Sequence, residues 1–282
     1  MPQPRPSPPP EPAVTAPRPA PPADRPLAVV TGPTAGIGRA FVERLAERGH
    51  DLLLVARDEA RLSALAVELS ARHGVHAEIA AHDLTDPAAV EALARTLAAL
   101  PRIDVLVNNA GFGTLGALTR TDPAPQLAMV QLHCATPLRL TQAVLTGMVA
   151  RRAGLVINVS SIAAFVAGPG NATYAASKSF VRMLSEGLAA ELRGTGVQVQ
   201  ALCPGFTRTE FHARMGSAPS EIPAPLWLTP EAVVDASLRA ADRGGPVTVV
   251  PSLRYRALVA ALRHAPMRAL SWASGRGPKG RV

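Results

Sequence analysis

The sequence has very little cysteine and no long apolar run. Only two of its 282 residues are cysteine, Cys134 and Cys203, and both lie in apolar segments without metal-type spacing. This pattern favours a reduced, cytoplasmic protein over a disulfide scaffold, and it gives no indication of a metal site. No apolar stretch reaches the roughly 18 residues of a membrane-spanning helix, and the N-terminus lacks the charged-then-apolar pattern of a secretory signal. We therefore expect neither a membrane span nor secretion.

Lysine is also scarce, and the C-terminal segment has no acidic residue. Lys178 and Lys279 are the only lysines among 29 basic residues, which draws attention to Lys178. Residues 252–282 hold seven basic residues and no acidic one, so the net charge of +8 leaves only +1 for residues 1–251. Because the positive charge belongs to a tail with no recognised nucleic-acid motif, we expect no nucleic-acid partner.

The two ends of the chain differ in composition from the part between them. Residues 1–26 contain twelve prolines and no apolar period. This predicts a disordered, Pro-rich extension, either dispensable or a docking peptide for a proline-recognition domain. Residues 251–282 form a basic amphipathic tail. It either lies on an anionic membrane surface or packs on the domain or on a second subunit.

The central part, residues 27–250, alternates short apolar runs with helical patterns. Runs such as 27–32 and 103–111 are apolar over most of their length, and amphipathic segments such as 37–49 separate them. Apolar strands that alternate with helices predict a parallel sheet covered on both faces. We therefore predict a single doubly wound α/β domain with a mostly parallel seven-stranded sheet. Its ligands are expected at the carboxyl ends of the strands.

The first strand-to-helix turn is rich in glycine. Gly32, Gly36 and Gly38 in "TGPTAGIG" lie between the first strand and the first helix. Glycine lets a pyrophosphate come close to the backbone at such a turn, and the N-terminus of the helix attracts the negative charge of the pyrophosphate. The alternative is a purely structural turn. Arg57 ends the second strand, where an acidic residue would bind an adenosine ribose hydroxyl and an arginine a 2′-phosphate. Since no Asp or Glu stands in "LLLVAR", this turn and strand favour NADP(H) over NAD(H).

Tyr174 and Lys178 lie one helical turn apart in "YAASK". A tyrosine has a pKa near ~10, so proton transfer at neutral pH requires a fall of roughly 3 units in that pKa. A lysine ammonium at i+4 and an oxidised nicotinamide, itself positive, would each favour the phenolate. Ser161, at the end of the preceding strand, is available to hydrogen-bond a substrate oxygen.

Taken in order, these elements resemble the short-chain dehydrogenase/reductase family over about residues 27–210, nearest to its ketoacyl and hydroxysteroid reductase branch. The resemblance rests on Thr31-Gly32-x-x-x-Gly36-x-Gly38, Asp83, Asn108-Asn109-Ala110-Gly111, Ser161, Tyr174-x-x-x-Lys178 and Pro204-Gly205 with Thr209. It implies a Rossmann-type catalytic domain in which Tyr174 transfers the proton, Lys178 binds the nicotinamide ribose and Ser161 orients the carbonyl. The cofactor-binding residues that it implies are Gly32, Thr34, Gly36, Ile37, Gly38, Arg57, Asp83, Leu84, Asn109, Ala110, Gly111, Tyr174, Lys178, Pro204, Gly205 and Thr209.

One position departs from the family pattern. On the long helix expected at about 124–150, the family usually has an asparagine that helps to hold a water beside the lysine. His133 stands in that place here. It is either a tolerated replacement or a further member of the catalytic proton relay with a titration near pH 6–7.

Residues 206–229 fall where the family keeps its substrate lid. The apolar residues in this segment either line a pocket for a lipophilic carbonyl or alcohol, or pack against the domain; they are Phe211, Met215, Ile222, Leu226 and Trp227. The resemblance also implies a homodimer or homotetramer that pairs through the long helix and the helix of Tyr174.

Two other functions compete with an NADP(H)-dependent oxidoreductase. A catalytically silent cofactor-binding sensor or interaction protein on the same fold is disfavoured, because Ser161, Tyr174 and Lys178 are present together. A nucleotide-sugar epimerase or dehydratase would have the other glycine spacing and a larger C-terminal substrate domain.

Overall fold

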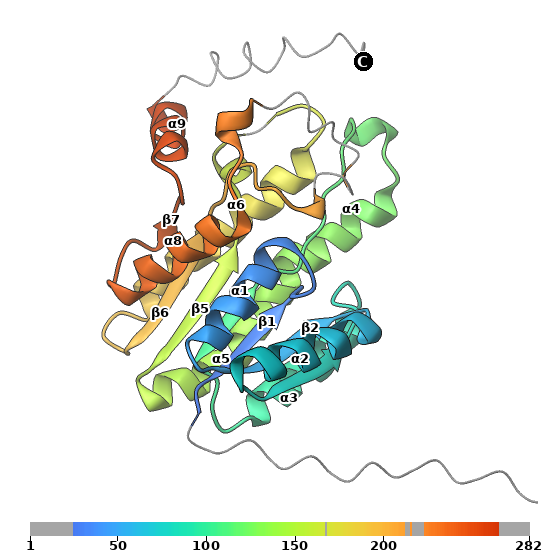
Figure 1. The fold of residues 1–282 in the computed structure, drawn as a ribbon. Coiled ribbons are helices and arrows are strands. Elements are labelled where there is room, and N and C mark those ends of the chain that lie inside the picture. Colours follow the sequence, from blue (N-terminus) through green and yellow to red (C-terminus); the bar gives the residue numbers. More distant parts are fainter. Residues whose placement is uncertain (1–24, 167, 212–214, 216–222, 265–282) are drawn as a thin grey trace, which may run out of the picture.

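A computed structural model describes residues 25–166, 168–211, 215 and 223–264 (Figure 1). Its centre is a seven-stranded sheet in the order β3-β2-β1-β4-β5-β6-β7, in which every pairing is parallel. The strands are β1 (Leu27–Thr31), β2 (Asp51–Ala56), β3 (Ala77–Ala81), β4 (Val105–Asn108), β5 (Gly154–Val159), β6 (Val197–Leu202) and β7 (Thr248–Val249). The predicted doubly wound sheet is confirmed. The strand order reverses between β1 and β4, which is where this fold binds ligands.

Several expectations concern residues outside the described part of the chain. They are the Pro-rich extension up to residue 24, the middle of the predicted lid at 212–214 and 216–222, and the tail from residue 265 onward.

The central strands β1 and β2 are apolar over most of their length because both faces of the sheet are covered there. In β1, Val29 points to one core, and its neighbours Ala28 and Val30 point to the other. In β2, Leu53 and Leu54 divide between the same two cores. Successive side chains of a strand point to opposite faces, so a continuous apolar run is needed where neither face meets water.

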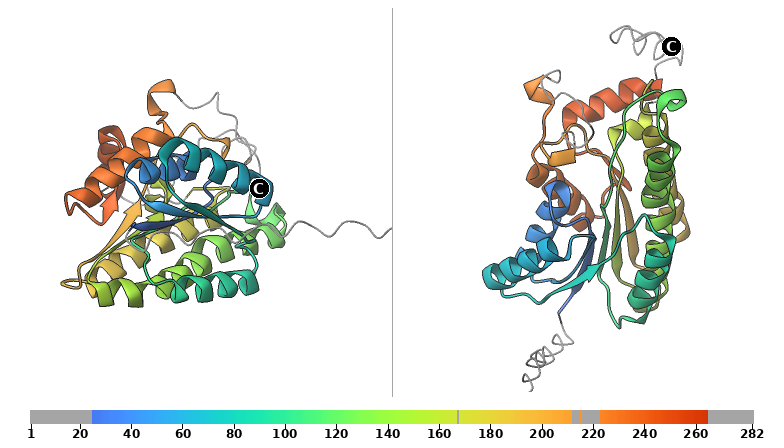
Figure 2. Two further views of the ribbon diagram at one scale, coloured as in Figure 1. Left: turned by 60° about the horizontal axis from the view of Figure 1, so that its bottom comes forward. Right: turned by 90° about the vertical axis from the view of Figure 1, so that its right-hand side faces the viewer.

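Two layers of helices provide this cover (Figure 2). The helices on one face are α1 (Gly36–Glu47), α2 (Glu59–His73) and α8 (Pro230–Asp242). Those on the other face are α3 (Pro87–Ala99), α5 (Thr136–Arg151) and α6 (Ala172–Glu191). Pro87 opens α3, and the Asp86 side chain caps it by accepting a hydrogen bond from the Ala88 N–H.

The long helix predicted at about 124–150 is present but interrupted. It consists of α4 (Pro123–Val130), a π-helical turn η2 (Gln131–Ala135) and α5. Pro137 has no N–H for the carbonyl of residue 133, and its ring crowds the preceding turn, which favours a wider turn at this point. His133 therefore lies in the π turn and not in regular helix.

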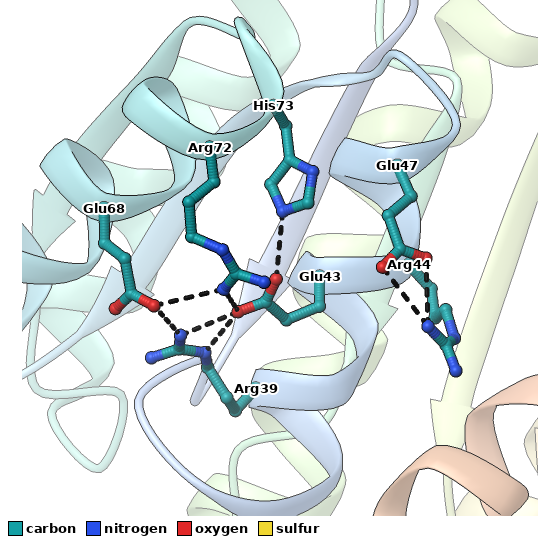
Figure 3. Close-up of polar contacts among 7 residues, drawn as sticks. All are labelled: Arg39, Glu43, Arg44, Glu47, Glu68, Arg72 and His73. Carbon is teal, nitrogen blue, oxygen red and sulfur yellow. Dashed lines mark hydrogen bonds and ion pairs between the residues drawn. The ribbon is translucent and has the colours of Figure 1, made fainter.

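A network of ion pairs joins α1 to α2 on the outer side of the first face (Figure 3). Arg39 and Arg72 each contact both Glu43 and Glu68, and His73 also contacts Glu43. Although partial burial acts to raise it, the hydrogen bonds from Arg39 and His73 hold the pKa of the Glu43 carboxyl below its usual range. The network fixes α1, whose N-terminus begins directly at the glycine turn.

After β7 the chain forms α9 (Leu253–His264), which packs on the domain. Tyr255 and Val259 are buried there, whereas Leu253 and Leu258 are exposed. Within the described residues, no helix combines the length and the apolar character that a membrane crossing requires.

Candidate active site

The carboxyl ends of β1, β4, β5 and β6 leave the sheet at one edge. The parallel register places Val107 of β4 between Val30 of β1 and Ile157 of β5, so the loops that follow these strands lie next to one another. The predicted residues in these loops, or at the first position of α1 in the case of Gly36, are Gly32, Thr34, Gly36, Asn109, Ala110, Gly111, Ser161, Pro204, Gly205 and Thr209. The fold therefore gathers residues that are up to 177 positions apart in the sequence.

The glycine turn is tight and is tied to the loop after β4. Gly32 has a φ of +66°, in the left-handed region, and a Cβ on Gly38 would overlap the Gly32 carbonyl oxygen. The Asn109 side chain donates to the carbonyls of Thr31 and Gly32 at 2.9 and 3.0 Å. In return, the Thr31 hydroxyl oxygen accepts from the N–H groups of Asn109 and Ala110 at 2.9 and 3.0 Å. These bonds fix the turn at the edge of the sheet.

The N-terminus of α1 opens at this turn without a side-chain cap. Ala35 occupies the N-cap position, and the first turn of the helix contains no acidic residue. Its backbone N–H groups and the positive end of the helix dipole can therefore be used by an anionic ligand. The Ile37 side chain packs on the core beneath. Of the predicted residues around this turn, Thr34 contributes its carbonyl to Arg61 at 3.4 Å.

Arg57 follows β2 on the other side of β1 and β4 from Ser161. Its side chain is 72% exposed, and a guanidinium nitrogen lies 3.9 Å from a carboxylate oxygen of Asp83, the second residue after β3. Asp83 also accepts hydrogen bonds from the N–H and hydroxyl of Thr85. Next to it, Leu84 is buried and its carbonyl accepts from the Thr136 hydroxyl at 2.8 Å. A positive group is thus held at one end of the edge, open to a ligand.

Ser161, Tyr174 and Lys178 meet at the other end of this edge. Tyr174 and Lys178 lie one turn apart on α6, with the Lys178 ammonium 5.8 Å from the centre of the Tyr174 ring. A side-chain hydrogen bond joins Ser161 to Tyr174. Lys178 is buried and donates to the carbonyl of Val159, at the end of β5, at 2.9 Å. The sheet edge and the first turns of α6 therefore hold the three side chains in one cluster.

Burial dominates the ionisation of this cluster. It raises the pKa of Tyr174 to about 12, although the hydrogen bond from Ser161 acts in the opposite direction. It also lowers the pKa of Lys178 to about 8. In this structure the charge of Lys178 does not offset the burial of the tyrosine, so the fall in tyrosine pKa expected from the sequence is not achieved by the protein side chains alone.

His133 is buried and makes two hydrogen bonds of defined direction. Its Nε2 accepts from the backbone N–H of Phe112 at 3.3 Å, so the ring proton belongs on Nδ1. Nδ1 then donates to the Ser177 hydroxyl at 2.9 Å, and that hydroxyl donates to the Tyr174 carbonyl at 2.8 Å. Burial, followed by the charge of Lys178, holds the pKa of His133 well below its usual value. The imidazole is therefore neutral at pH 7. The titration near pH 6–7 that the sequence allowed would require a His133 pKa close to the ordinary value for histidine.

Apolar side chains from the predicted lid lie over Tyr174. The Phe211 ring is centred 5.9 Å from the Tyr174 ring, and Met215 lies against Gly113, where a Cβ would collide with its sulfur. Thr209 reaches the glycine turn: a Cβ on Gly36 would lie 2.7 Å from its methyl group. The lid segment thus touches both the tyrosine and the N-terminus of α1.

Two residues at this site were not named from the sequence, and a third, Thr31, was named only as part of the glycine motif. Ser177 links His133 to the helix of Tyr174, Thr31 fixes the loop after β4, and Phe112 donates its N–H to His133. Thr31 and Ser177 directly precede Gly32 and Lys178, so the motifs that contain Gly32 and Lys178 could have indicated these two positions. Phe112 acts through its backbone N–H, which does not depend on the side chain, so its residue type gave no signal.

The comparisons with known proteins agree with this geometry. Residues 26–219 match the family model described as short chain dehydrogenase. A short-chain dehydrogenase from Sphingobium yanoikuyae, solved in complex with NADPH, is 34% identical, with a TM-score of 0.78, and the match covers 91% of this chain and 98% of that one. A bulky-bulky ketone specific alcohol dehydrogenase from Comamonas testosteroni is 30% identical, with a TM-score of 0.74 and coverages of 92% and 98%. The serine 3-dehydrogenase of Agrobacterium fabrum is 39% identical over 194 residues, which are 65% of this chain and 72% of that protein.

Proposed function

The chain belongs to the short-chain dehydrogenase family and is an oxidoreductase, and from this premise we propose that it transfers a hydride between NADP(H) and a carbonyl or secondary alcohol. The observation that carries this proposal is the cluster of Ser161, Tyr174 and Lys178 at the sheet edge that also holds the glycine turn. A binding protein without catalytic activity has no need of these three side chains together.

The residues at the sheet edge fit a dinucleotide. The uncapped N-terminus of α1 and the close approach of Gly32 and Gly38 suit a pyrophosphate. Asp83 and Leu84, with Asn109 to Gly111, would hold the adenosine side, and Pro204, Gly205, Thr209 and Lys178 the nicotinamide side. When bound, the nicotinamide supplies the hydride donor or acceptor.

Arg57 supports a preference for NADP(H). Its exposed guanidinium stands at the end of β2, the position that distinguishes a ribose hydroxyl from a 2′-phosphate. The related enzyme from Sphingobium yanoikuyae was solved with NADPH, which agrees with this choice.

In the reaction, Tyr174 would exchange a proton with the substrate oxygen while Ser161 orients that oxygen by a hydrogen bond. Since burial raises the pKa of Tyr174 to about 12, the phenol is protonated at neutral pH, which suits the donor role in carbonyl reduction. Lys178 remains mostly protonated at pH 7, because its lowered pKa is still about 8. Its ammonium would stabilise the phenolate that forms when the proton leaves.

For His133 we propose a positioning role. A neutral imidazole with both nitrogens engaged joins the loop after β4 to the first turns of α6. It would fix Tyr174 relative to the loop at Gly111 and would carry no proton of the reaction.

A lipophilic substrate fits the side chains around Tyr174. Phe211 packs on its ring, and Met215 and Phe112 lie nearby on the lid and the loop after β4. The relative from Comamonas testosteroni is specific for bulky-bulky ketones, whereas the relative from Agrobacterium fabrum is a serine 3-dehydrogenase. A substrate panel must therefore include both bulky ketones and small polar hydroxy acids.

The test is a titration of the purified protein with NADPH and NADH, followed by turnover measurements with that panel. We expect tighter binding of NADPH and reduction of at least one bulky ketone, with slower or no turnover of the polar substrates. NADPH binding without turnover of any substrate would favour the cofactor-binding sensor. If neither cofactor binds, the proposed dinucleotide site is wrong.

We also propose that two copies of the chain pair through α5 and α6. Both helices carry large apolar side chains that are at least 36% exposed, namely Leu138, Val149, Phe180 and Met183. Light scattering of the wild type and of Met183→Glu tests this: the variant should shift toward the monomer, and a wild type that is monomeric at all concentrations would contradict the pairing. Contact of the basic tail with a membrane surface stays a prediction.

A further inference from the structure

The predicted lid leaves and re-enters the domain at one point, the base of the lid. Here Thr207 and Leu228 form an isolated parallel bridge. The Leu228 N–H donates to the Phe206 carbonyl at 2.8 Å, and the Arg208 N–H donates to the Leu228 carbonyl at 2.9 Å. The two ends of the lid are thus held together just after Gly205.

The hydroxyl of Tyr255, on α9, adds two further bonds at this point. It accepts from the backbone N–H of Phe206 at 3.1 Å and donates to the carbonyl of Leu226 at 2.7 Å. A phenol can do both at once, since it is donor and acceptor. One side chain therefore connects the outgoing and the returning end of the lid.

The Tyr255 ring is held as firmly as its hydroxyl. It is 2% exposed and lies so close to Gly205 that a Cβ on that glycine would overlap the ring. Beside it, Arg254 donates to the carbonyl of Pro225 at 2.7 Å. Tyr255 and Val259 share a core with Ile162 and Phe165, in the turn that directly follows Ser161. Helix α9 thus contacts the lid base and the segment that carries the candidate catalytic serine.

We propose that Tyr255 is a positioning residue for substrate binding, because its hydroxyl fixes the base of the lid and through it the place of Phe211 over Tyr174. The helix α9, outside the region that matches the family model, then belongs to the substrate site of this chain. This inference rests on the proposed function where it concerns substrate, but the fixed lid base can be tested without any turnover.

The experiment compares full-length wild type, Tyr255→Phe and, as a matched control on the same helix, Leu253→Ala, whose side chain is 78% exposed. Hydrogen exchange of peptides that contain Phe206 is measured first. We expect exchange at the Phe206 amide at least about tenfold faster in Tyr255→Phe, because its acceptor is gone, and wild-type exchange in the control. Unchanged exchange in Tyr255→Phe would overturn the proposal.

Kinetics then separate positioning from general loosening of the fold. For the carbonyl identified in the panel, Tyr255→Phe should raise KM about tenfold and lower kcat less than about threefold, with NADPH affinity within about twofold of wild type. Equal losses of NADPH affinity and kcat, or an unchanged KM despite faster exchange, would overturn the role in substrate binding. If the wild type turns over no carbonyl, the proposed function fails, and the exchange experiment still decides whether Tyr255 fixes the lid base. Arg254→Ala, which removes the bond to Pro225, serves as the second variant should Tyr255→Phe fold poorly.

Discussion

The two tyrosines of this chain lie in two regions that use a buried phenol differently. At the sheet edge, the Tyr174 hydroxyl is paired with a side chain, that of Ser161. At the lid base, the Tyr255 hydroxyl lies between a backbone N–H and a backbone carbonyl. Burial raises the pKa of both phenols, so burial does not distinguish them.

The partners of the hydroxyl make the difference. A serine hydroxyl can rotate and share a substrate oxygen with the phenol, so the hydrogen bond at Tyr174 can rearrange during a reaction. The backbone groups at Tyr255 are fixed by the fold and would lose their partner if the phenol moved. The first region suits chemistry and the second suits architecture.

The largest effect is expected from Tyr174→Phe. Loss of the proton donor should lower kcat about a thousandfold or more, while NADPH affinity stays within a few-fold. Its unfolding free energy should stay within about 0.5 kcal/mol of wild type, since no backbone group loses a partner. Steady-state kinetics, a cofactor titration and urea unfolding measure the three quantities.

Tyr255→Phe is the matched control for this change, with the opposite profile. It leaves the Phe206 N–H and the Leu226 carbonyl without their shared partner, so its unfolding free energy should fall by about 1–3 kcal/mol. Full activity in Tyr174→Phe, or equal stability losses in both variants, would contradict the contrast.

The sequence was sufficient for most of the fold. Continuous apolar runs predicted strands covered on both faces, and the sheet is confirmed with seven strands, all parallel. The interruption of the long helix was not predicted. The helix was expected to run through Pro137, but the residue type alone does not tell whether the helix accommodates this proline by a wider turn, as it does at η2.

The two tyrosine regions differ in how much of them could be read from the sequence. Tyr174 has a lysine at i+4 and a serine thirteen residues before it, a spacing that a motif records. The partners of Tyr255 are backbone groups 49 and 29 residues away, which impose no residue type. Side-chain chemistry leaves a pattern in the sequence, whereas a side chain that binds distant backbone groups does not.

The next largest effect should come from Arg57, which directly follows β2, on the other side of β1 from Ser161 at the end of β5. Arg57→Asp should shift the ratio of NADPH to NADH affinity toward NADH by about tenfold to a hundredfold, because a charge-assisted bond to a phosphate is replaced by repulsion. Cofactor titrations measure the ratio. Arg57→Met, which keeps a long side chain without the charge, should weaken NADPH binding without improving NADH binding. An unchanged affinity ratio in both variants would show that Arg57 does not recognise the phosphate.

A further test asks whether the region of Tyr174 carries an electrostatic cost. Burial lowers the pKa of Lys178 from 10.5 in the unfolded chain to about 8, so between these pH values the folded protein binds fewer protons than the unfolded chain. The cost of the buried ammonium is therefore full below pH 8 and disappears toward pH 10.5, and stability rises with pH across this window.

Lys178→Met removes that cost. The difference in unfolding free energy between variant and wild type should thus change in favour of the wild type by about 2 kcal/mol from pH 7 to pH 9.5. Urea unfolding at the two pH values gives this difference. Any constant loss from the freed Val159 carbonyl cancels in the comparison, and a difference that does not vary with pH would mean that Lys178 titrates normally in the folded state.

The smallest effect is expected at His133, where the question is whether the region of Tyr174 contains a second proton-transfer group. If His133 only positions, kcat should show no ionisation between pH 6 and 7, because burial keeps the imidazole neutral there. His133→Asn can still accept from the Phe112 N–H and donate toward Ser177, so it should keep kcat within about threefold and the same pH profile. His133→Phe can do neither and should lower kcat about tenfold, again without moving the profile, since a misplaced Tyr174 keeps its own ionisation. If His133→Asn instead abolished an ionisation that the wild type shows near pH 6–7, the imidazole would be part of the proton path, and the pairing of Ser161 with Tyr174 would no longer describe all of the proton-transfer chemistry in that region.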